Sequence, residues 1–497
     1  MLNSRVIAVL FSAFLMLNIF SVITLDNSAA PPDNNQTFDQ TFDDIWYSAA
    51  AQKIYRSYEN LTTKGVHINS SGAMDWINIT CNNTVNNFEV DQNGYFNITN
   101  STIDLIGNFI IRGHVRLINS TLVMNSSYNG EFKLEVTSTG NFTAINSTIT
   151  AYDQTTLHNG ANDFKTWGDH YNFTVLKNGK MTLIDCNVSH AWGNIDLTSR
   201  YGGGIRILSS DVLIFNCTIS QCEVAGVFVY GDVSPEIRNC TIENNTFSQV
   251  YTIYRAKPII DGNLIRNSPS WAGFGANFYM ESEPIFSNNT VENISIDGIV
   301  IERYSNVTIE NNIIRNCSRV GIIVWGAPYA ISPMINNNHI HNTSYGIYLI
   351  PFYVVGATIV LGSVSGNVSN NIIELNNVSG MLLNNQAASA GFTASINTSI
   401  YNNSIIHNEH GLFMVYSDPA VIENNLTNNN MSGLYILDHS TPSVSYNDIF
   451  YNRESGIIIN ESSAPVIFNN TIFNNDAHGI LTIDAQPTIT SNNITTN

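Results

Sequence analysis

The chain has 497 residues, of which 43% are hydrophobic and only 12% are charged, and its formal net charge is −19. This hydrophobic content is enough for an extended core, whereas the shortage of Lys and Arg argues against nucleic acids and anionic membrane surfaces as partners. An acidic exterior is typical of an exposed, soluble surface and can attract divalent cations.

The first 30 residues predict a targeting segment. A short positive region at 1–5 precedes an apolar stretch at 6–25, and small residues follow at 27–30. This order is typical of a secretory signal peptide, although 20 apolar residues are also long enough for an N-terminal membrane anchor. Both interpretations predict an extracellular or cell-surface protein.

Residues 31–94 predict a polar linker followed by a capping helix. The segment 41–44 resembles a capping box. The apolar residues after it fall on one helical face: Tyr47, Ala51, Ile54, Tyr55 and Tyr58. Such a helix would cover the first strand edge of the domain that follows.

From residue 95 to residue 497 a short sequence motif, here called the phrase, occurs sixteen times, most often at a spacing of 23 residues. Its third and eighth positions are apolar, its sixth is Asn, Cys or Ser, and Gly follows near position fifteen, as in 442–456. The phrase gives three short apolar segments per repeat and no sustained helical stripe. This pattern predicts three strands in each coil of one parallel β-helix domain.

The sixth position of the phrase predicts a ladder of buried side chains. Stacked Asn amides can donate to and accept from one another between coils. We also expect the Gly of each repeat to supply a turn with positive φ. The ladder residues are Ser101, Ser120, Ser147, Cys186, Cys217, Cys240, Asn263, Asn289, Asn312, Asn338, Asn371, Asn403, Asn424, Asn447, Asn470 and Asn492.

The cysteines of the ladder leave three interpretations open. Cys186, Cys217 and Cys240 should stack at about 4.8 Å per coil. They could form a disulfide, with Cys217 and Cys240 as the candidate pair in an oxidising compartment. They could instead bind a soft metal such as copper(I) or zinc, or simply replace Asn as small buried residues.

About thirty Asn-x-Ser/Thr sequons follow the targeting segment. Glycosylation is expected at some of them in a secreted protein. Several, such as those at Asn216 and Asn469, lie inside the repeat phrase, where the ladder itself demands Asn. These sequons therefore say less about glycosylation than their number indicates.

Two insertions, at about 151–171 and 189–203, interrupt consecutive coils between the second and third strands and should emerge side by side. Paired carboxylates serve sugar cleavage, carboxylate clusters bind Ca²⁺, and Trp faces stack on sugars. The candidate substrate-binding residues are Trp167, His170, His190, Trp192 and Arg200. The candidate Ca²⁺ ligands are Asp153, Asp163, Asp169 and Asp196, and the candidate catalytic residues are Asp163, Asp169, Asp196 and Arg206.

The last phrase, at 487–494, supplies two strands of a coil. We expect the apolar column to meet water at Ile489 and Ile494. Open strand edges pair readily with other chains, so this end predicts self-association or a covering partner.

The repeat resembles the right-handed β-helix repeats shared by carbohydrate-binding proteins and sugar hydrolases, and especially the periplasmic copper-binding accessory proteins of nitrous oxide reductase maturation. Phrases such as 307–314, followed by Gly321-Ile322, carry the resemblance. It implies an all-β, right-handed parallel β-helix of the pectin-lyase-like type, with about 16 coils after the N-terminal helical cap. The adjacent Asp pair, Gly-His-Gly and Arg-Ile-Lys of polygalacturonases do not occur in the coils.

These features predict a noncatalytic, secreted or cell-surface β-helix protein for carbohydrate binding, adhesion or scaffolding, with a polysaccharide or surface glycan as partner. One alternative is a polysaccharide lyase or glycoside hydrolase acting in a cleft formed by residues 151–206. Another is an extracytoplasmic copper-binding accessory protein, for which the cysteine stack is the candidate site. Ca²⁺ is the one cofactor that the insertion aspartates suggest.

Overall fold

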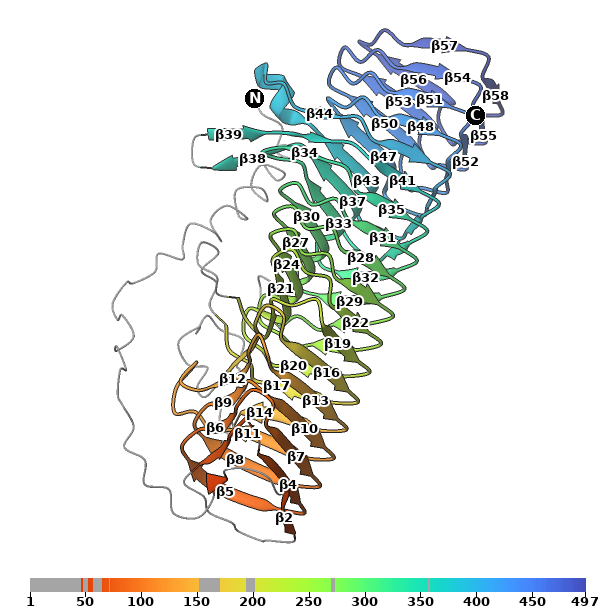
Figure 1. Cartoon of the computed structure of the whole chain (residues 1–497). Coiled ribbons are helices and arrows are strands. Elements are labelled where there is room, and N and C mark those ends of the chain that lie inside the picture. The colour runs from red at the N-terminus through yellow and green to blue at the C-terminus, as the bar shows by residue number, and fades with distance from the viewer. Residues whose placement is uncertain are drawn as a thin grey trace.

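The computed structural model describes residues 46–47, 52–56, 65–70, 72–151, 170–193, 202–269, 273–355 and 358–497. These residues wind into a long rod of stacked coils (Figure 1). Each full coil contributes one strand to each of three parallel sheets, here named A, B and C, and the chain passes from B to C to A. The predicted all-β parallel solenoid is therefore confirmed.

Sheet A has 18 strands among the described residues. They are β1 (Trp46–Tyr47), β3 (Val66–Ile68), β6 (Phe88–Val90), β9 (Phe109–Ile111), β12 (Lys133–Val136), β15 (Asn172–Val175), β18 (Ile205–Ile207), β21 (Ala225–Tyr230), β24 (Ser248–Ile253), β27 (Phe274–Tyr279), β30 (Asp297–Glu302), β33 (Val320–Trp325), β37 (Tyr345–Ile350), β43 (Ser379–Asn384), β47 (His410–Val415), β50 (Leu434–Leu437), β53 (Ile457–Asn460) and β56 (Ile480–Ile483).

Sheet B forms the second stack. Its strands are β2 (Gln52–Arg56), β4 (Ala73–Ile77), β7 (Tyr95–Thr99), β10 (His114–Ile118), β13 (Asn141–Ile145), β16 (Lys180–Ile184), β19 (Val212–Phe215), β22 (Glu236–Arg238), β25 (Ile259–Asp261), β28 (Ile285–Ser287), β31 (Thr308–Glu310), β35 (Met334–Asn336), β41 (Asn367–Ser369), β45 (Ser399–Tyr401), β48 (Ala420–Ile422), β51 (Ser443–Ser445), β54 (Val466–Phe468) and β57 (Thr488–Thr490).

Sheet C follows sheet B in each coil from β4 onward. Its strands are β5 (Thr80–Val85), β8 (Thr102–Ile106), β11 (Thr121–Met124), β14 (Thr148–Ala151), β17 (Asn187–Ser189), β20 (Thr218–Ser220), β23 (Thr241–Glu243), β26 (Leu264–Arg266), β29 (Thr290–Ile294), β32 (Ile313–Cys317), β36 (His339–His341), β42 (Ile372–Glu374), β46 (Ser404–Ile406), β49 (Asn425–Thr427), β52 (Asp448–Phe450), β55 (Thr471–Phe473) and β58 (Asn493–Thr495).

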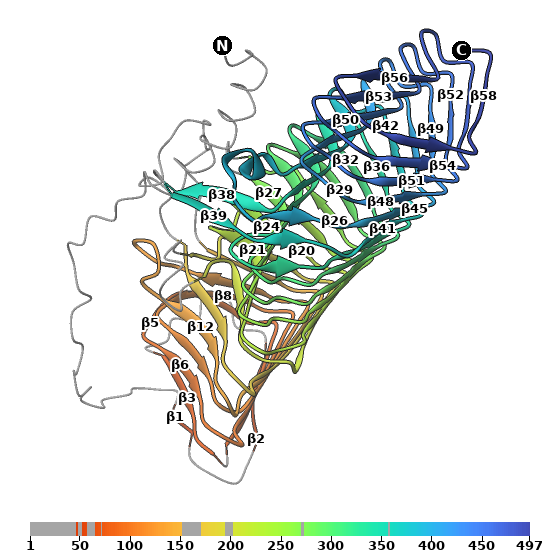
Figure 2. The ribbon, with the colours of Figure 1, turned by 90° about the horizontal axis from the view of Figure 1, so that it is seen from above.

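The remaining elements come from the loops after sheet A. Strands β38 (Phe352–Val355) and β39 (Thr358–Leu361) form an antiparallel hairpin. Strands β34 (Ala330–Ile331), β40 (Ser363–Val364) and β44 (Ser395–Ile396) form a small parallel sheet. The 3-10 helix η1 (Gln386–Ala390) is the one helix among the described residues. Figure 2 shows the hairpin and η1 on the side of the rod that carries sheet A.

The segment predicted as a capping helix is different where it is described. Strand β1 pairs in parallel with β3, and β2 pairs with β4, so both continue the coils. Sheets A, B and C thus begin before residue 95. Pairing with the next coil outweighs the local helical pattern, because short segments follow their tertiary context rather than their intrinsic propensity.

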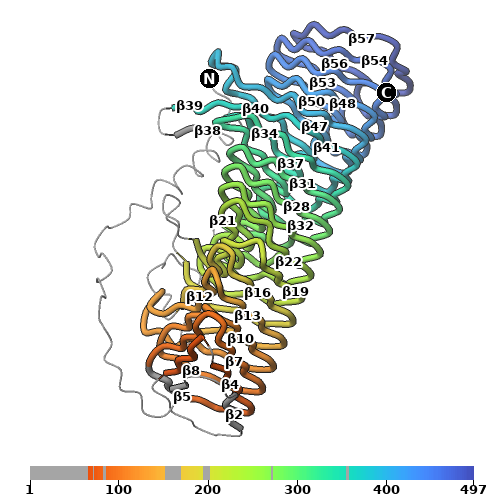
Figure 3. The backbone as a smooth tube through the Cα atoms, viewed as in Figure 1, coloured from red at the N-terminus to blue at the C-terminus, as the bar shows by residue number. Residues whose placement is uncertain are grey.

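One continuous apolar core runs through the coils from Val66 to Ile472. In-register stacking builds it: Val444 of β51 pairs with Val421 and Ile467 of the neighbouring coils, and all three are fully buried. The tube in Figure 3 shows the same coil shape repeated along the rod. At the C-terminal end Ile489 and Ile494 are exposed, as the sequence predicted. Association through that end stays a prediction.

The predicted ladder of asparagines is confirmed from Asn263 to Asn492. At Asn447, for example, Nδ2 donates to Asn470 Oδ1 (2.9 Å) and to the Val421 carbonyl (2.9 Å). A second ladder, which the sequence analysis did not predict, runs along the far end of sheet C. Its members are Asn376, Asn408, Asn429, Asn452, Asn475 and Asn497.

The role predicted for the repeat glycines is wrong. Gly298 and Gly321 lie within β30 and β33 and do not have positive φ. Glycine is needed there because coils approach closely: a Cβ on Gly298 would lie 2.6 Å from the Gly321 carbonyl oxygen. The positive φ values belong mainly to polar residues at the corners between sheets, Asn above all.

Candidate functional site

The cluster predicted in the 151–206 insertions is described only at its flanks. His170, His190, Trp192 and Arg206 belong to the described residues. The other predicted site residues lie outside them: Asp153, Asp163, Trp167, Asp169, Asp196 and Arg200.

The structure brings the two predicted histidines together, with ring centroids 5.4 Å apart. His170 is buried, and its Nε2 lies 3.2 Å from the Gln221 carbonyl oxygen. His190 Nδ1 lies 3.0 Å from the Ser189 hydroxyl. The pair therefore sits between neighbouring coils rather than on an open surface.

Trp192 and Arg206 come from different parts of the coil. The Trp192 ring covers the backbone at Gly130, because a Cβ on Gly130 would lie 2.9 Å from the ring. Arg206 is on β18 of sheet A, in register with Thr174 and Phe228. Both side chains are half-buried.

Glu223 is an acid of this region that the sequence analysis missed. Its backbone N–H donates to the Ala191 carbonyl (2.9 Å), which places it beside the segment that carries His190 and Trp192. Burial raises the pKa of Glu223 to about 8. An acid that is protonated near neutral pH can serve as a proton donor. The available signal was an acid between two apolar residues, Cys222 and Val224.

All six cysteines are free and buried, so the structure does not contain the predicted Cys217–Cys240 disulfide. The thiols take the place of ladder amides instead: the backbone N–H of Cys186 donates to Cys217 Sγ (3.4 Å), and that thiol donates to the Phe215 carbonyl (3.2 Å). In-register stacking holds successive Cβ atoms about 4.8 Å apart, which is longer than a disulfide permits.

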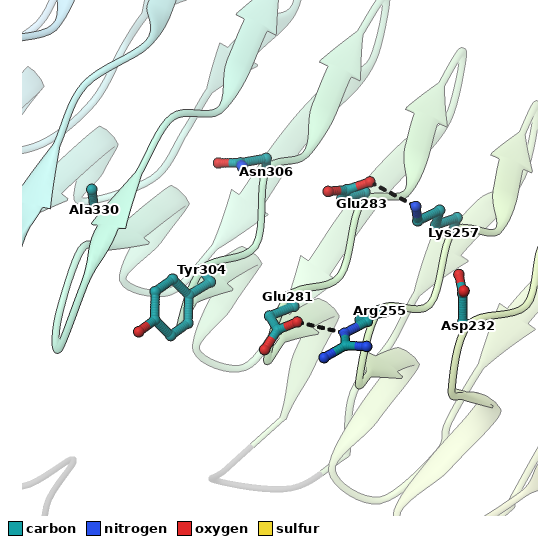
Figure 4. Close-up of a pocket in the computed structure, with 8 residues that line it drawn as sticks. All are labelled: Asp232, Arg255, Lys257, Glu281, Glu283, Tyr304, Asn306 and Ala330. Atoms are coloured by element: carbon teal, nitrogen blue, oxygen red, sulfur yellow. Dashed lines mark hydrogen bonds and ion pairs between the residues drawn. The ribbon is translucent and has the colours of Figure 1, made fainter.

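A pocket of about 370 Å³ lies at the corner where the chain passes from sheet A to sheet B. Figure 4 shows its lining, which comes from consecutive coils. Arg255 Nε donates to Glu281 Oε2 (2.6 Å), and Lys257 Nζ lies 3.1 Å from Glu283 Oε2. The lining residues are Asp232, Arg255, Lys257, Glu281, Glu283, Tyr304, Asn306 and Ala330. We call this the corner pocket.

Tyrosine rings continue along the same corner. Tyr304 and Tyr329 stack with ring centroids 3.6 Å apart and are 37% and 47% exposed. Two coils before Tyr304, Tyr254 is exposed to a similar extent and packs edge-on against Tyr230. Exposed aromatic faces next to charged groups form a surface with both apolar and hydrogen-bonding character.

The hairpin β38–β39 extends this aromatic region across the ends of the sheet A strands. The Arg303 guanidinium lies 4.8 Å from the Tyr279 ring centroid and 5.9 Å from that of Tyr353, which is on β38. Each contact is within the range of a cation–π interaction. Strand β38 therefore lies beside the corner that carries the pocket.

Glu302, at the end of β30, is the acid buried in this region. It is 8% exposed, and Asn277 Nδ2 donates to its Oε1 at 3.5 Å. Burial raises the pKa of Glu302 to about 7, although the nearby Arg303 opposes the shift. Burial also raises the pKa of Tyr279 well above its usual value. These groups stay uncharged more readily than they would in water.

Among the described residues, no group of three or more His, Cys, Asp or Glu side chains is placed to hold a metal ion. The predicted Ca²⁺ ligands lie outside those residues, and the cysteine stack does not form such a group. In the same part of the chain, no helix has the length and apolar character needed to cross a bilayer.

The corner pocket was missed by the sequence analysis. A signal for it was present: Tyr254-Arg255, Met280-Glu281 and Arg303-Tyr304 each follow the third apolar segment of their repeat. Aligning the repeats on that segment would have placed these side chains in one column. These residues lie within coils of ordinary length and not in long insertions.

The family model described as "Right handed beta helix region" matches residues 203–351 and 357–497. The match covers more than half of the chain. The protein belongs to this right-handed β-helix family. The family assignment confirms the handedness that the resemblance implied.

Solved structures of low identity are also similar. The periplasmic alginate epimerase AlgG has 12% identity and a TM-score of 0.30, over 78% of this chain and 77% of that one. A family 28 exopolygalacturonase of Yersinia enterocolitica has 11% identity and a TM-score of 0.35, over 76% and 73%. The Dettilon tailspike protein has 13% identity and a TM-score of 0.33, over 78% and 62%. No curated protein matches the chain.

Proposed function

We propose that this protein binds a carbohydrate chain in the corner pocket, without catalysis, on the outside of the cell. The observation that carries the proposal is the combination, in one pocket, of ion-paired side chains and the exposed ring of Tyr304, which stacks on Tyr329 at the same corner. Sugar rings present apolar C–H faces that stack on aromatic rings, and hydroxyls that hydrogen-bond to charged and amide groups. The corner pocket offers both within consecutive coils.

The shape of the pocket favours an extended ligand. Its lining residues belong to five consecutive coils, so the column from Asp232 to Ala330 rises by about 19 Å at 4.8 Å per coil. The carboxylates of Glu281 and Glu283 are each paired with a cation across one coil. Exposed carboxylates that are already ion-paired can accept hydrogen bonds from the hydroxyls of a neutral glycan.

The first test is a glycan-array screen of the purified chain, followed by titration calorimetry with the best ligand. Tyr304→Ala and Tyr329→Ala should each weaken binding about tenfold, since stacking contacts of this kind contribute on the order of 1 kcal/mol or more. Tyr446→Ala is the matched control, because Tyr446 is 54% exposed but lies on a different corner.

Two outcomes would contradict the proposal. One is that no glycan binds the intact chain. The other is that binding occurs but is equally strong in Tyr304→Ala, Tyr329→Ala and Tyr446→Ala, which would move the site elsewhere.

A second candidate is sugar cleavage beside the 151–206 insertions, and Glu223 is the observation that favours it. Its backbone lies next to the segment carrying His190, and burial keeps its carboxyl protonated near neutral pH. This function predicts turnover of a polysaccharide that Glu223→Gln abolishes. Equal product formation by the wild type and Glu223→Gln would exclude Glu223 as the proton donor.

A further inference from the structure

The corner between sheets B and C has one conformation in nearly every coil. The residue just before the ladder position has φ between about +47° and +58°, and it is exposed, whether it is Asn119, Asp185 or Tyr446. Asparagine is the residue that adopts this left-handed region most readily after glycine. These corners form the long edge on the right of the rod in Figure 1.

Nine of these corner residues are asparagines that head an Asn-x-Ser/Thr sequon. The middle residue of each sequon is a ladder residue, except Ile79 in the equivalent place after Asn78, and the hydroxyl residue is the first residue of the next sheet C strand, as Thr471 is in β55. The corner asparagines are Asn78, Asn100, Asn119, Asn146, Asn216, Asn239, Asn288, Asn402 and Asn469.

In these sequons the asparagine that would carry the glycan and the residue at the ladder position are different residues. In Asn469-Asn470-Thr471 the ladder residue is Asn470, which is buried, whereas the sequon asparagine is Asn469, which is exposed. The expectation that the ladder demands the asparagines of these sequons is therefore wrong. The backbone does not require Asn either, since Glu423 and Tyr446 take the same conformation at equivalent corners.

We propose that the B–C corner is a line of N-glycosylation sites along one edge of the rod, independent of the proposed sugar-binding function. In the reaction, the Asn Nδ2 bonds to the anomeric carbon of a lipid-phosphate-linked oligosaccharide. Nδ2 loses one proton, and the lipid phosphate leaves. The host membrane supplies this lipid-linked donor, and the host's oligosaccharyltransferase catalyses the transfer.

The amide geometry at the corner is compatible with a glycan. Asn146 Nδ2 donates to Asn119 Oδ1 (2.9 Å), and Asn119 Nδ2 donates to Asn100 Oδ1 (3.3 Å), with all three residues exposed. A primary amide has two N–H groups, and a glycosylated Asn keeps one of them. The hydrogen bond to the preceding coil can therefore persist after modification.

Sequons on strands differ from corner sequons. Asn172, on β15, is half-buried, and its Nδ2 donates to the Gly130 carbonyl (2.9 Å). Asn97, on β7, is also half-buried, and its Nδ2 donates to Asp75 Oδ1 (2.7 Å). A glycan attached at either site would clash with the side chains packed around the asparagine, so the folded protein should not carry one there.

Neighbouring corners should compete with one another. Asn78, Asn100, Asn119 and Asn146 occupy four successive coils about 4.8 Å apart, which leaves little room for a glycan on each. Asn288, Asn402 and Asn469 have no sequon asparagine at the corners of the adjoining coils. We therefore expect the highest occupancy at these three sites.

The test is expression of the full chain in a glycosylating secretory host, with glycopeptide mass spectrometry after enzymatic deglycosylation in ¹⁸O-water. Asn288, Asn402 and Asn469 should be occupied, and Asn97 and Asn172 should not. Thr471→Val should remove the mass of one glycan, whereas the matched variant Thr471→Ser keeps the sequon and should retain it.

The proposal is overturned if the secreted, folded chain carries glycans on Asn97 and Asn172 but not on the corner sites. It is also overturned if all sequons are empty while a secreted reporter in the same cells is glycosylated. Sugar binding at the corner pocket is measured separately on unglycosylated protein, so failure of one proposal leaves the other intact.

Discussion

The coils before and after residue 263 are built on the same backbone but joined by different ladders. In the N-terminal coils the ladder side chain is a hydroxyl or a thiol: Ser120 Oγ accepts from the Ser101 N–H (3.0 Å) and donates to the Ile118 carbonyl (2.7 Å). In the C-terminal coils an amide serves: Asn447 Oδ1 accepts both the N–H (2.8 Å) and Nδ2 (3.0 Å) of Asn424, and its own Nδ2 bonds onward to Asn470.

This difference shows that the apolar columns and the ladder have separate roles in the coil. The apolar columns shape the coil in both regions, because in-register aliphatic stacking is the same before and after residue 263. The ladder determines how many side-chain hydrogen bonds join adjacent coils. One Asn side chain bonds to the coils on both sides of it, whereas one Ser hydroxyl makes fewer hydrogen bonds. The second ladder, from Asn376 onward, adds a continuous run of further hydrogen bonds between the C-terminal coils.

Asn447→Ala should give the largest loss of stability among the variants that test this comparison. It removes the acceptor of two Asn424 donors and the Nδ2 that donates to the Val421 carbonyl and to Asn470 Oδ1, so unfolding should be easier by about 3 kcal/mol. Denaturant unfolding followed by circular dichroism measures it. Asn430→Ala, at an exposed position, is the matched control, and an equal shift in both variants would contradict the ladder's role.

Glu302→Gln tests a buried polar side chain that belongs to neither ladder. Because burial raises the pKa of Glu302 to about 7, the folded chain holds this proton more tightly than the unfolded chain. Stability should therefore fall as pH rises from about 5 to 8, by up to about 2 kcal/mol from this group. Glu302→Gln should flatten that slope in parallel melts across the range, and identical slopes would refute the assignment.

Ser120→Ala should cost less than the Asn447 change, at about 1 kcal/mol, because one accepted and one donated hydrogen bond are lost. The same denaturant titration applies. A loss as large as that of Asn447→Ala would show that the two ladders tie coils equally well.

The cysteines should show the smallest effect. Cys217→Ser keeps a small donor and acceptor at the ladder position, so the expected change is below about 1 kcal/mol. Burial raises the pKa of Cys222 to about 12, and buried thiols of this kind are unreactive. A thiol reagent should modify no cysteine in the folded chain and all six after denaturation. Rapid modification of the native protein would contradict the packing.

The sequence by itself determined the coil. A phrase repeated every 23 residues predicted three strands per turn and an amide column through Asn447 and its counterparts, because a solenoid repeats its contacts with the same period as its sequence. It also predicted the exposed apolar end at Ile489 and Ile494. Local periodicity was enough for these features, since each depends only on a residue and its equivalent one coil away.

The tertiary structure alone decided what the period does not encode. Residues 52–56 form a strand in place of the expected helix because β2 pairs with β4. Position 298 requires glycine because the next coil approaches its backbone closely. The corner pocket arises where Arg255, Glu281 and Tyr304 project from successive turns into one column. Whether such side chains converge depends on the shape of the turns between sheets, which neighbouring coils fix through contacts that no single repeat contains.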